Sequence, residues 1–340
     1  METLLLSARS ASDRAPVERA AAILRNGGLV AIPTETVYGL AANALNPDAV
    51  LRIYAAKGRP QDNPLIVHVD SLEMARGLVT AWPESAERLA AAFWPGPLTM
   101  ILPRAAAVPA VVSCGLDTVA VRFPSHPVAR AVIRACGLPL AAPSANRSGS
   151  PSPTRASHVL ADLNGRIEAV LDSGGSAVGV ESTVVSLCGA PRLLRPGFVT
   201  IEELRAQLGA VEVDPAVYHA VEAGRPVASP GMKYRHYAPR ARVTIVKGAL
   251  CDVQGYVAKQ GDADCVLCFD GEQTAFPVRT VCYGAAGDGA AQAARLFGAL
   301  RTLDELGAKR VYARCPVLHG VGMAVYNRLL RAAQFDVVEV

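Results

Sequence analysis

The chain has 340 residues, of which 51% are hydrophobic and 19% charged, so it has enough apolar material for folded cores and is unlike disordered proteins. Its formal net charge is only +4 and it has no long basic run, which argues against a wide nucleic-acid surface but allows a local basic pocket. No apolar run is long enough for a membrane span, and the N-terminal leucine run stops at Leu6, short of a secretory leader; we expect a cytoplasmic protein.

Helix-like and strand-like segments alternate through residues 1–208. Asn46, Pro47 and Gly58 occupy the positions typical of a helix cap, a first helical residue and a helix end. Helices are predicted at 16–28, 46–58, 71–79, 83–94, 126–137, from about 157, and at 199–209; strands are predicted at 29–33, 65–69, 98–103, 118–124, 138–143, 169–174, 181–188 and 191–197. This order predicts an α/β or α+β domain with a mixed sheet.

The character of the sequence changes at residues 209–240, which have little periodicity and several Pro and Gly residues. We interpret them as a linker, although Lys, Arg, His and Tyr side chains are unusual in a linker. Residues 241–340 then alternate again, with strands at 242–248, 265–270, 279–284, 310–316 and 335–340 and helices at 288–308 and 325–333. The alternation predicts a second, smaller domain with a Rossmann-like parallel sheet.

The eight cysteines are scattered along the chain, and only Cys265 and Cys268 form a C-x-x-C pair. This pair lies in a predicted buried strand, without the further Cys or His ligands that a zinc site needs. Reduced, packed thiols are therefore expected, with a redox role as the alternative.

The stretch KGRPQDNPLIVHV places four polar residues between a predicted helix and a buried strand: Lys57, Arg59, Asn63 and His68. Lys57 alone could be a solvated charge at a helix end, where it complements the helix dipole. Two cations followed by an amide, however, suit an anion with several oxygens, and phosphate is the natural candidate. Taken singly, each side chain is compatible with a structural role or a functional one.

Three more passages put polar residues at the ends of apolar strands. PTETVYGL follows one strand, APSANRSGSPSPT follows another, and Arg122 lies beside two valines, where a buried cation needs an anionic partner. Strand ends of this kind are where α/β folds bind ligands, although ordinary turns would give the same pattern. No G-x-x-x-x-G-K-[ST], G-x-S-x-G or H-E-x-x-H motif occurs, which excludes several familiar nucleotidase, hydrolase and metalloprotease sites.

Six motifs together resemble the two-domain threonylcarbamoyl-AMP synthases: PTETVYGLAANA, KGRPQDNPLIVHV, FWPGPLTMIL, VAVRFPSHP, APSANRSGSPSPT and SPGMKYRHYAP. The resemblance implies a YrdC-like catalytic domain with a twisted mixed sheet at 1–208, a linker at 209–240 and a smaller C-terminal domain at 241–340. It also implies a reaction in which L-threonine, bicarbonate and ATP give threonylcarbamoyl-AMP and pyrophosphate. The product would pass to a tRNA threonylcarbamoyl transferase complex that modifies tRNAs reading ANN codons.

The resemblance further implies roles for particular residues. Lys57 and Arg59 would be catalytic and would bind the triphosphate. The threonine and bicarbonate side would include Thr36, His68, Arg122, Ala142 and Ser182. Further ATP contacts would be Asn63, Thr118, Ser144, Asn146, Ser152, Arg195 and His236, and Tyr234 and Tyr237 would belong to a lid. Mg²⁺ would enter with ATP, without a dedicated protein metal site.

Two alternatives from other classes remain open at this point. An RNA-binding YrdC-like module would bind RNA with an affinity that falls with salt and does not need ATP. A relative that forms a carbamoyl-adenylate would use a similar domain, but such proteins carry extra domains that nothing in this sequence resembles.

Overall fold

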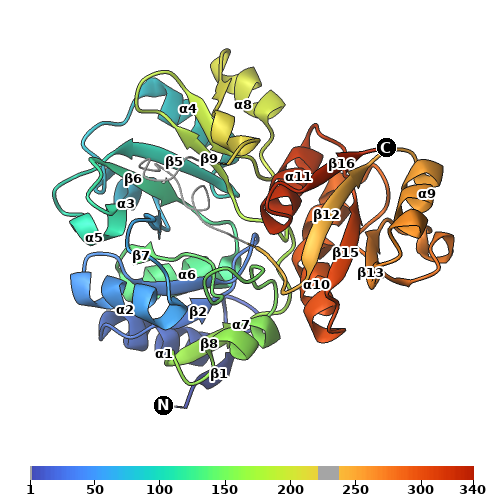
Figure 1. Ribbon diagram of the computed structural model, residues 1–340. Helices are drawn as coiled ribbons and strands as arrows, with labels where there is room; N and C mark the ends of the chain where they lie inside the picture. Colours follow the sequence, from blue (N-terminus) through green and yellow to red (C-terminus); the bar gives the residue numbers. More distant parts are fainter. Residues whose placement is uncertain (1, 221–236) are drawn as a thin grey trace.

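The computed structural model describes residues 2–220 and 237–340. They form a mixed sheet of eleven strands and a separate parallel sheet of five strands (Figure 1). We call residues 2–220 the N-terminal unit and residues 237–340 the C-terminal unit. The expected α/β architecture, with a large mixed sheet and a smaller parallel one, is confirmed.

The large sheet has the strand order β1-β8-β2-β3-β7-β4-β6-β5-β9-β10-β11. Its strands are β1 (Leu4–Ser7), β2 (Val30–Ile32), β3 (Gly39–Asn43), β4 (Ile66–His68), β5 (Leu98–Pro103), β6 (Thr118–Arg122), β7 (Leu140–Ala141), β8 (Ala169–Asp172), β9 (Thr183–Ser186), β10 (Arg192–Arg195) and β11 (Glu212–Val213). The helices are α1 (Arg14–Arg25), α2 (Pro47–Lys57), α3 (Leu72–Arg76), α4 (Glu84–Phe93), α5 (Ala110–Ser113), α6 (Pro127–Cys136), α7 (Ala156–Leu163) and α8 (Ile201–Leu208).

Some elements of the large sheet are absent from the sequence prediction. β1 pairs with β8, and β3 pairs antiparallel with β2, although neither segment alternates apolar and polar residues. Residues 209–240 were expected to be a linker, but the described part of them contains β11, which pairs with β10, and the short helix η1 (Pro215–Val217). The large sheet therefore extends into the sequence expected to be linker.

Helix α2 begins and ends as its sequence predicts. The Asn46 side chain accepts hydrogen bonds from the backbone N–H groups of Asp48 and Ala49, and Pro47 occupies the first turn. Gly58 ends the helix with φ 60°, a left-handed conformation that glycine adopts without a Cβ clash. This tight end turns the chain back toward the sheet, and the last helical residue, Lys57, is buried.

The C-terminal unit has five parallel strands in the order β14-β13-β15-β12-β16. They are β12 (Arg242–Lys247), β13 (Cys265–Cys268), β14 (Arg279–Cys282), β15 (Arg310–Arg314) and β16 (Val337–Glu339), with helices α9 (Leu250–Gln260), η2 (Gln273–Ala275), α10 (Gly289–Glu305) and α11 (Val321–Ala332). Helices α10 and α11 lie on the side of this sheet that faces the N-terminal unit, and α9 lies on the opposite side (Figure 1). All eight cysteines are free thiols, and both members of the C-x-x-C pair are buried in β13.

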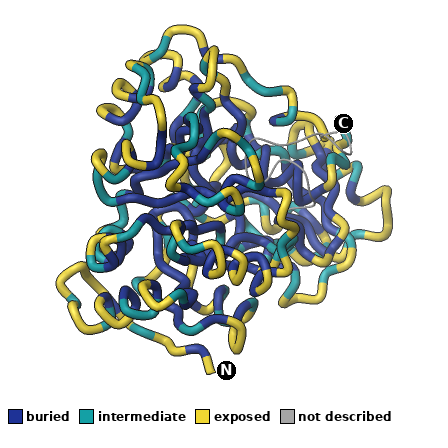
Figure 2. Tube along the Cα trace, turned by 90° about the vertical axis from the view of Figure 1, so that its left-hand side faces the viewer, coloured by how far each residue is buried: buried dark blue, intermediate teal, exposed yellow. Residues whose placement is uncertain are grey.

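Buried residues lie in the interior of the molecule and exposed residues at its outside (Figure 2). Val37 and Val180 of the N-terminal unit belong to the apolar core around α10, while Met323 of α11 packs into the core of the large sheet. A Cβ on Gly179 would lie 2.4 Å from the backbone of α10, so this segment touches the helix directly. The two units therefore share a packed interface.

Among residues 2–220 and 237–340, no helix combines the length and apolar character that crossing a membrane needs.

Candidate active site

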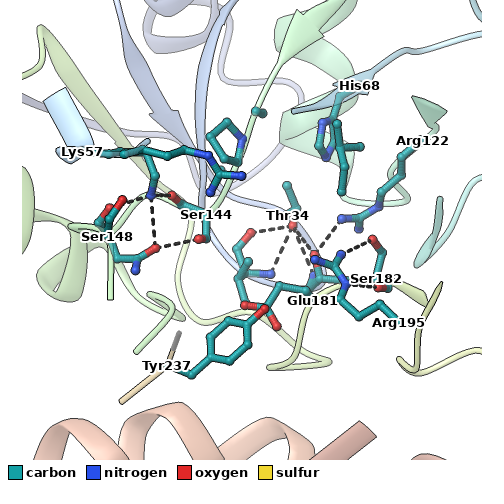
Figure 3. A pocket seen from close by; sticks show the side chains of 18 of the residues that line it. Thr34, Lys57, His68, Arg122, Ser144, Ser148, Glu181, Ser182, Arg195 and Tyr237 are labelled. Atoms are coloured by element: carbon teal, nitrogen blue, oxygen red, sulfur yellow. Dashed lines mark hydrogen bonds between the residues drawn. The ribbon is translucent and has the colours of Figure 1, made fainter. Parts of the chain in front are cut away.

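A cavity lined mainly by the N-terminal unit collects polar residues from the ends of several strands (Figure 3). The space between its lining residues, including solvent at the open mouth, is about 710 Å³. Its lining comprises Thr34, Thr36, Val37, Gly39, Lys57, Arg59, Ile66, His68, Arg122, Ala142, Pro143, Ser144, Asn146, Ser148, Gly149, Ser150, Glu181, Ser182, Arg195 and Tyr237. Strand register explains part of this gathering, because His68 ends β4 directly beside Arg122 at the end of β6.

Lys57 and Arg59 lie on one side of the cavity. The Nζ atom of Lys57 donates to the backbone oxygens of Ser144 and Asn146, the latter at 2.6 Å, and no carboxylate of the described residues pairs with it. Burial and then the charge of Arg59 hold the pKa of Lys57 well below its usual value. Half-buried Arg59 donates to the backbone oxygens of Asn63 and Pro64. An anion beside this pair would favour the charged form of Lys57, so this side suits an anionic ligand.

Arg122 has a resident anionic partner that the sequence did not identify. Its Nη2 lies 2.7 Å from Oε1 of Glu35, and its Nη1 donates to the Thr36 hydroxyl at 2.8 Å. Burial opposes ionisation of Glu35, but the Arg122 guanidinium outweighs burial and holds the pKa of this carboxyl below its ordinary value. The contact at Nη2 is an ion pair without hydrogen-bond geometry, so that within the described residues Nη2 still has an unused N–H group.

The opposite side of the cavity is formed around the start of β9. Arg195, at the end of β10, donates to the backbone oxygen and the hydroxyl of Ser182, each at 3.1 Å. The Ser182 hydroxyl also contacts the Thr99 hydroxyl at 2.7 Å. Glu181 precedes Ser182 and is the only carboxylate among the described lining residues. Sequence reasoning missed Glu181, although its place at the start of the strand predicted at 181–188 was a usable signal.

His68 is buried at the end of β4, and its Nδ1 has no hydrogen-bond partner among the described residues. Burial, and secondarily the charge of Arg122, lower the pKa of His68 to about 3. The imidazole is therefore neutral at physiological pH. It can offer a donor or an acceptor to a ligand but does not carry a positive charge there.

The buried His68 predicts a pH dependence of folding stability. The unfolded chain protonates this side chain below its ordinary pKa of about 6.5, whereas the folded chain does so only near pH 3. The unfolded state thus binds more protons between these values, and His68 makes the free energy of unfolding fall by up to about 1.4 kcal/mol per pH unit as pH decreases through this window.

Denaturant melts of wild type and His68→Gln from pH 7 to pH 4 measure this effect. We expect His68→Gln to flatten the profile, while a matched change at the exposed His219→Gln leaves it unchanged. Equal slopes for wild type and His68→Gln would show that His68 is not the buried neutral group described.

Most of the sequence-predicted site residues line the cavity, but three do not. Asn63 is buried beneath Arg59, and neither atom of its side-chain amide has a hydrogen-bond partner among the described residues. Thr118 lies at the start of β6, away from the lining, and Ser152 is fully buried with its hydroxyl on Glu181. Tyr234 and His236 lie outside the described residues. Tyr237 lines the cavity, and the centre of its ring lies 5.3 Å from the centre of the Phe297 ring.

A metal site needs several ligand groups, such as carboxylate, imidazole or thiol groups, close together. Within residues 2–220 and 237–340, no group of three or more His, Cys, Asp or Glu side chains could hold a metal ion.

Comparisons with known proteins agree with this geometry. A family model described as "Telomere recombination" matches residues 22–197, and a second, described as "Threonylcarbamoyl-AMP synthase, C-terminal domain", matches residues 199–334. The threonylcarbamoyl-AMP synthase of Pyrococcus abyssi is 44% identical over 345 residues, which cover 99% of this chain and 100% of that protein. The Bacillus subtilis counterpart is 46% identical and covers 93% of this chain, with 92% of its own length matched.

The chain belongs to the threonylcarbamoyl-AMP synthase family. The solved structure of P. abyssi Sua5 complexed with L-threonine matches the fold with a TM-score of 0.91 at 42% identity, covering 99% of this chain and 100% of that one. The resemblance inferred from the sequence is thereby confirmed for both units, including the C-terminal unit.

Proposed function

We propose that this chain is an L-threonylcarbamoyladenylate synthase that converts L-threonine, bicarbonate and ATP into threonylcarbamoyl-AMP and pyrophosphate. One observation carries the proposal: Lys57, Arg59, Arg122 and Arg195 line one cavity, in a chain whose relatives over its full length carry this name. Among the described lining residues, four Lys and Arg side chains surround a single carboxylate, which suits a reaction between two anions.

The reaction requires two negatively charged groups to approach each other. The amine of threonine first combines with bicarbonate to give a carbamate and water. A carbamate oxygen then attacks the α-phosphorus of ATP, a P–O bond forms, and the bond to the departing pyrophosphate breaks. Fixed cations lower the repulsion between carbamate and triphosphate, and a closed site keeps them oriented. Such a site needs positive charge more than it needs a general base.

The two sides of the cavity suggest how the substrates divide it. Lys57 and Arg59, with Ser144 and Asn146 of the neighbouring loop, would hold the triphosphate. Arg122 would bind the threonine carboxylate through its unused N–H group while Glu35 and Thr36 keep its guanidinium in place. Thr36, neutral His68, the Ala142 backbone and Ser182 would surround the rest of the amino acid.

ATP is proposed to enter as its magnesium complex, with the ion bound mainly by phosphate oxygens and water. Asn63 lies beside Arg59 with both amide atoms available, so a modest shift of this loop would add a polar contact for the nucleotide. We assign the activity to the cytoplasm, where ATP and tRNA occur. The product would then be consumed by a tRNA threonylcarbamoyl transferase complex.

The product itself tests the proposal. We expect the purified chain, incubated with ATP, Mg²⁺, ¹³C-bicarbonate and L-threonine, to form a labelled threonylcarbamoyl-adenylate that mass spectrometry detects. L-serine in place of threonine tests the amino-acid pocket, where one methyl group gives a preference of only about 10- to 200-fold. Pyrophosphate release without a labelled adenylate would contradict the proposed function.

A further inference from the structure

Helix α11 of the C-terminal unit sends one arginine into the N-terminal unit. Arg328 is 0% exposed. Its Nε donates to Oε2 of Glu181 at 2.7 Å, its Nη2 to the backbone oxygen of Glu181 at 3.2 Å, and its Nη1 to the backbone oxygen of Pro196 at 2.8 Å. Figure 1 shows α11 on the side of the C-terminal unit that faces the N-terminal unit. The guanidinium of Arg328 therefore binds Glu181 and Pro196, which lie next to strands β9 and β10 of the large sheet.

Glu181, the partner of Arg328, is part of the cavity wall described above. Figure 3 shows it beside Ser182, Arg195 and Tyr237. Its second carboxylate oxygen accepts a hydrogen bond from the hydroxyl of Ser152. The Glu181 carboxylate thus binds both Arg328, which lies outside the cavity, and the buried Ser152. It also lies in the same cavity wall as Arg195.

The charge of Glu181 is a disadvantage in a cavity that binds anions. An unpaired carboxylate there would repel phosphate and would compete with it for Lys57 and Arg195, which both lie close enough to interact with it electrostatically. Arg328, which is not among the lining residues of the cavity, neutralises Glu181 from outside it. It is also held over the ring of Tyr237, with 5.6 Å between the guanidinium carbon and the ring centre.

We propose that Arg328 is a positioning residue of the nucleotide pocket, supplied by the C-terminal unit, which neutralises Glu181 so that Lys57 and Arg195 remain available to phosphate. This inference rests on the proposed function, because it assumes that the cavity binds ATP. It gives the C-terminal unit a direct part in the site: the larger unit alone would contain a buried carboxylate without its main counter-charge.

Other arginines cross the same interface without reaching a lining carboxylate, and they provide a matched control. Arg331, one turn further along α11, donates to the backbone oxygen of Ala216 and lies over the ring of Phe335. Arg331→Met removes an interface arginine from the same helix and leaves Arg328 and Glu181 in place. If a weaker interface alone lowered the affinity for MgATP, Arg331→Met would lower it as well.

The experiment compares wild type, Arg328→Met, Arg331→Met and the double variant Glu181→Gln/Arg328→Met in the full chain. Calorimetric titration with MgATP gives the affinity, pyrophosphate release gives kcat and KM, and thermal melting reports folding. We expect Arg328→Met to weaken MgATP binding and raise its KM by about 10- to 100-fold. In the double variant the MgATP affinity and the KM should return to within about threefold of the wild-type values, because no unpaired carboxylate remains. Arg331→Met should match wild type.

The pH dependence separates this role from a purely structural one. In Arg328→Met the described groups left to interact with Glu181 are Arg195, Ser152, Tyr237 and Lys57. Protonation removes the negative charge of Glu181, so the MgATP deficit of this variant should shrink as pH falls from 8 to 6. The double variant should lack this trend.

Three outcomes would overturn the inference: unchanged MgATP binding in Arg328→Met, a double variant as impaired as the single one, or an equal loss in Arg331→Met. If Arg328→Met does not fold, the double variant, which contains no unpaired charge, still tests the inference. MgATP binding much weaker than that of wild type in this variant would overturn it. A wild-type chain that binds MgATP but forms no threonylcarbamoyl-adenylate would refute the proposed function while the binding comparison still tests Arg328. A wild-type chain that does not bind MgATP would refute both.

Discussion

Lys57→Met is expected to lower kcat/KM for ATP by roughly 100- to 1000-fold, the range typical when an enzyme loses one fixed donor that stabilises developing negative charge. The Nζ atom of Lys57 is held by the backbone oxygens of Ser144 and Asn146, so the positive charge is aimed at one place in the cavity. Methionine keeps most of the volume of the side chain and removes only the charge and its hydrogen bonds. Pyrophosphate release at varied ATP concentration measures the loss.

Folding must be separated from catalysis for this variant. Ser144 and Asn146 lose a hydrogen-bond donor, so we expect the free energy of unfolding to fall by about 1–3 kcal/mol, with a cooperative melt preserved. Lys259→Met, at an exposed position of α9, is the matched control and should retain wild-type kinetics. Wild-type kcat/KM in Lys57→Met would remove this lysine from the proposed triphosphate site.

Arg122→Met is expected to raise the Kd for L-threonine by at least about 30-fold, because loss of one member of a buried charge pair in a binding site costs about 2–5 kcal/mol. The variant also leaves Glu35 buried without its ion-pair partner, which destabilises a fold by about 3–5 kcal/mol. The loss of affinity follows from the missing contact with the threonine carboxylate, whereas the loss of stability follows from the missing ion pair of 2.7 Å between Arg122 and Glu35. Calorimetric titration with L-threonine measures the affinity, and denaturant melts measure the stability.

A second variant separates the two effects. Glu35→Gln/Arg122→Met leaves no unpaired charge, and the amide oxygen of the new glutamine can still accept from the backbone N–H of Ser125, as Glu35 does at 3.1 Å. This double variant should recover most of the stability but none of the threonine affinity. Arg134→Met, which removes an exposed arginine paired with Asp70, should change neither. Recovery of threonine binding in the double variant would rule out the carboxylate contact.

Local signals in the sequence predicted much of the fold. The helix α2 has a side-chain cap, a proline in its first turn and a glycine end, and each signal acts within a few residues. The parallel strands of the C-terminal unit were predictable because they alternate regularly with helices. β1 and β3 were missed because they are set by their partners: β1 pairs with β8, whose residues lie about half the chain away, and β3 is a run of small residues.

The site was predictable in its residue types but not in its contacts. Polar residues at strand ends pointed to the cavity, and a buried arginine required an anion, yet the sequence could not identify Glu35 as the partner of Arg122. Lys57 could have been a solvated helix end, and only the tertiary fold brings the Ser144 and Asn146 carbonyl groups to it. The pair of Arg328 and Glu181 joins residues 147 positions apart, so no local pattern encodes it.

A crystal structure with L-threonine and a non-hydrolysable MgATP analogue tests the central claim most directly, namely that one cavity brings a carboxylated amino acid and a nucleotide together on fixed cations. We predict that phosphate oxygens contact Lys57 and Arg59, and that the threonine carboxylate lies on Arg122 with its amine directed toward the α-phosphate. A nucleotide bound elsewhere, or a threonine carboxylate that does not touch Arg122, would contradict the account.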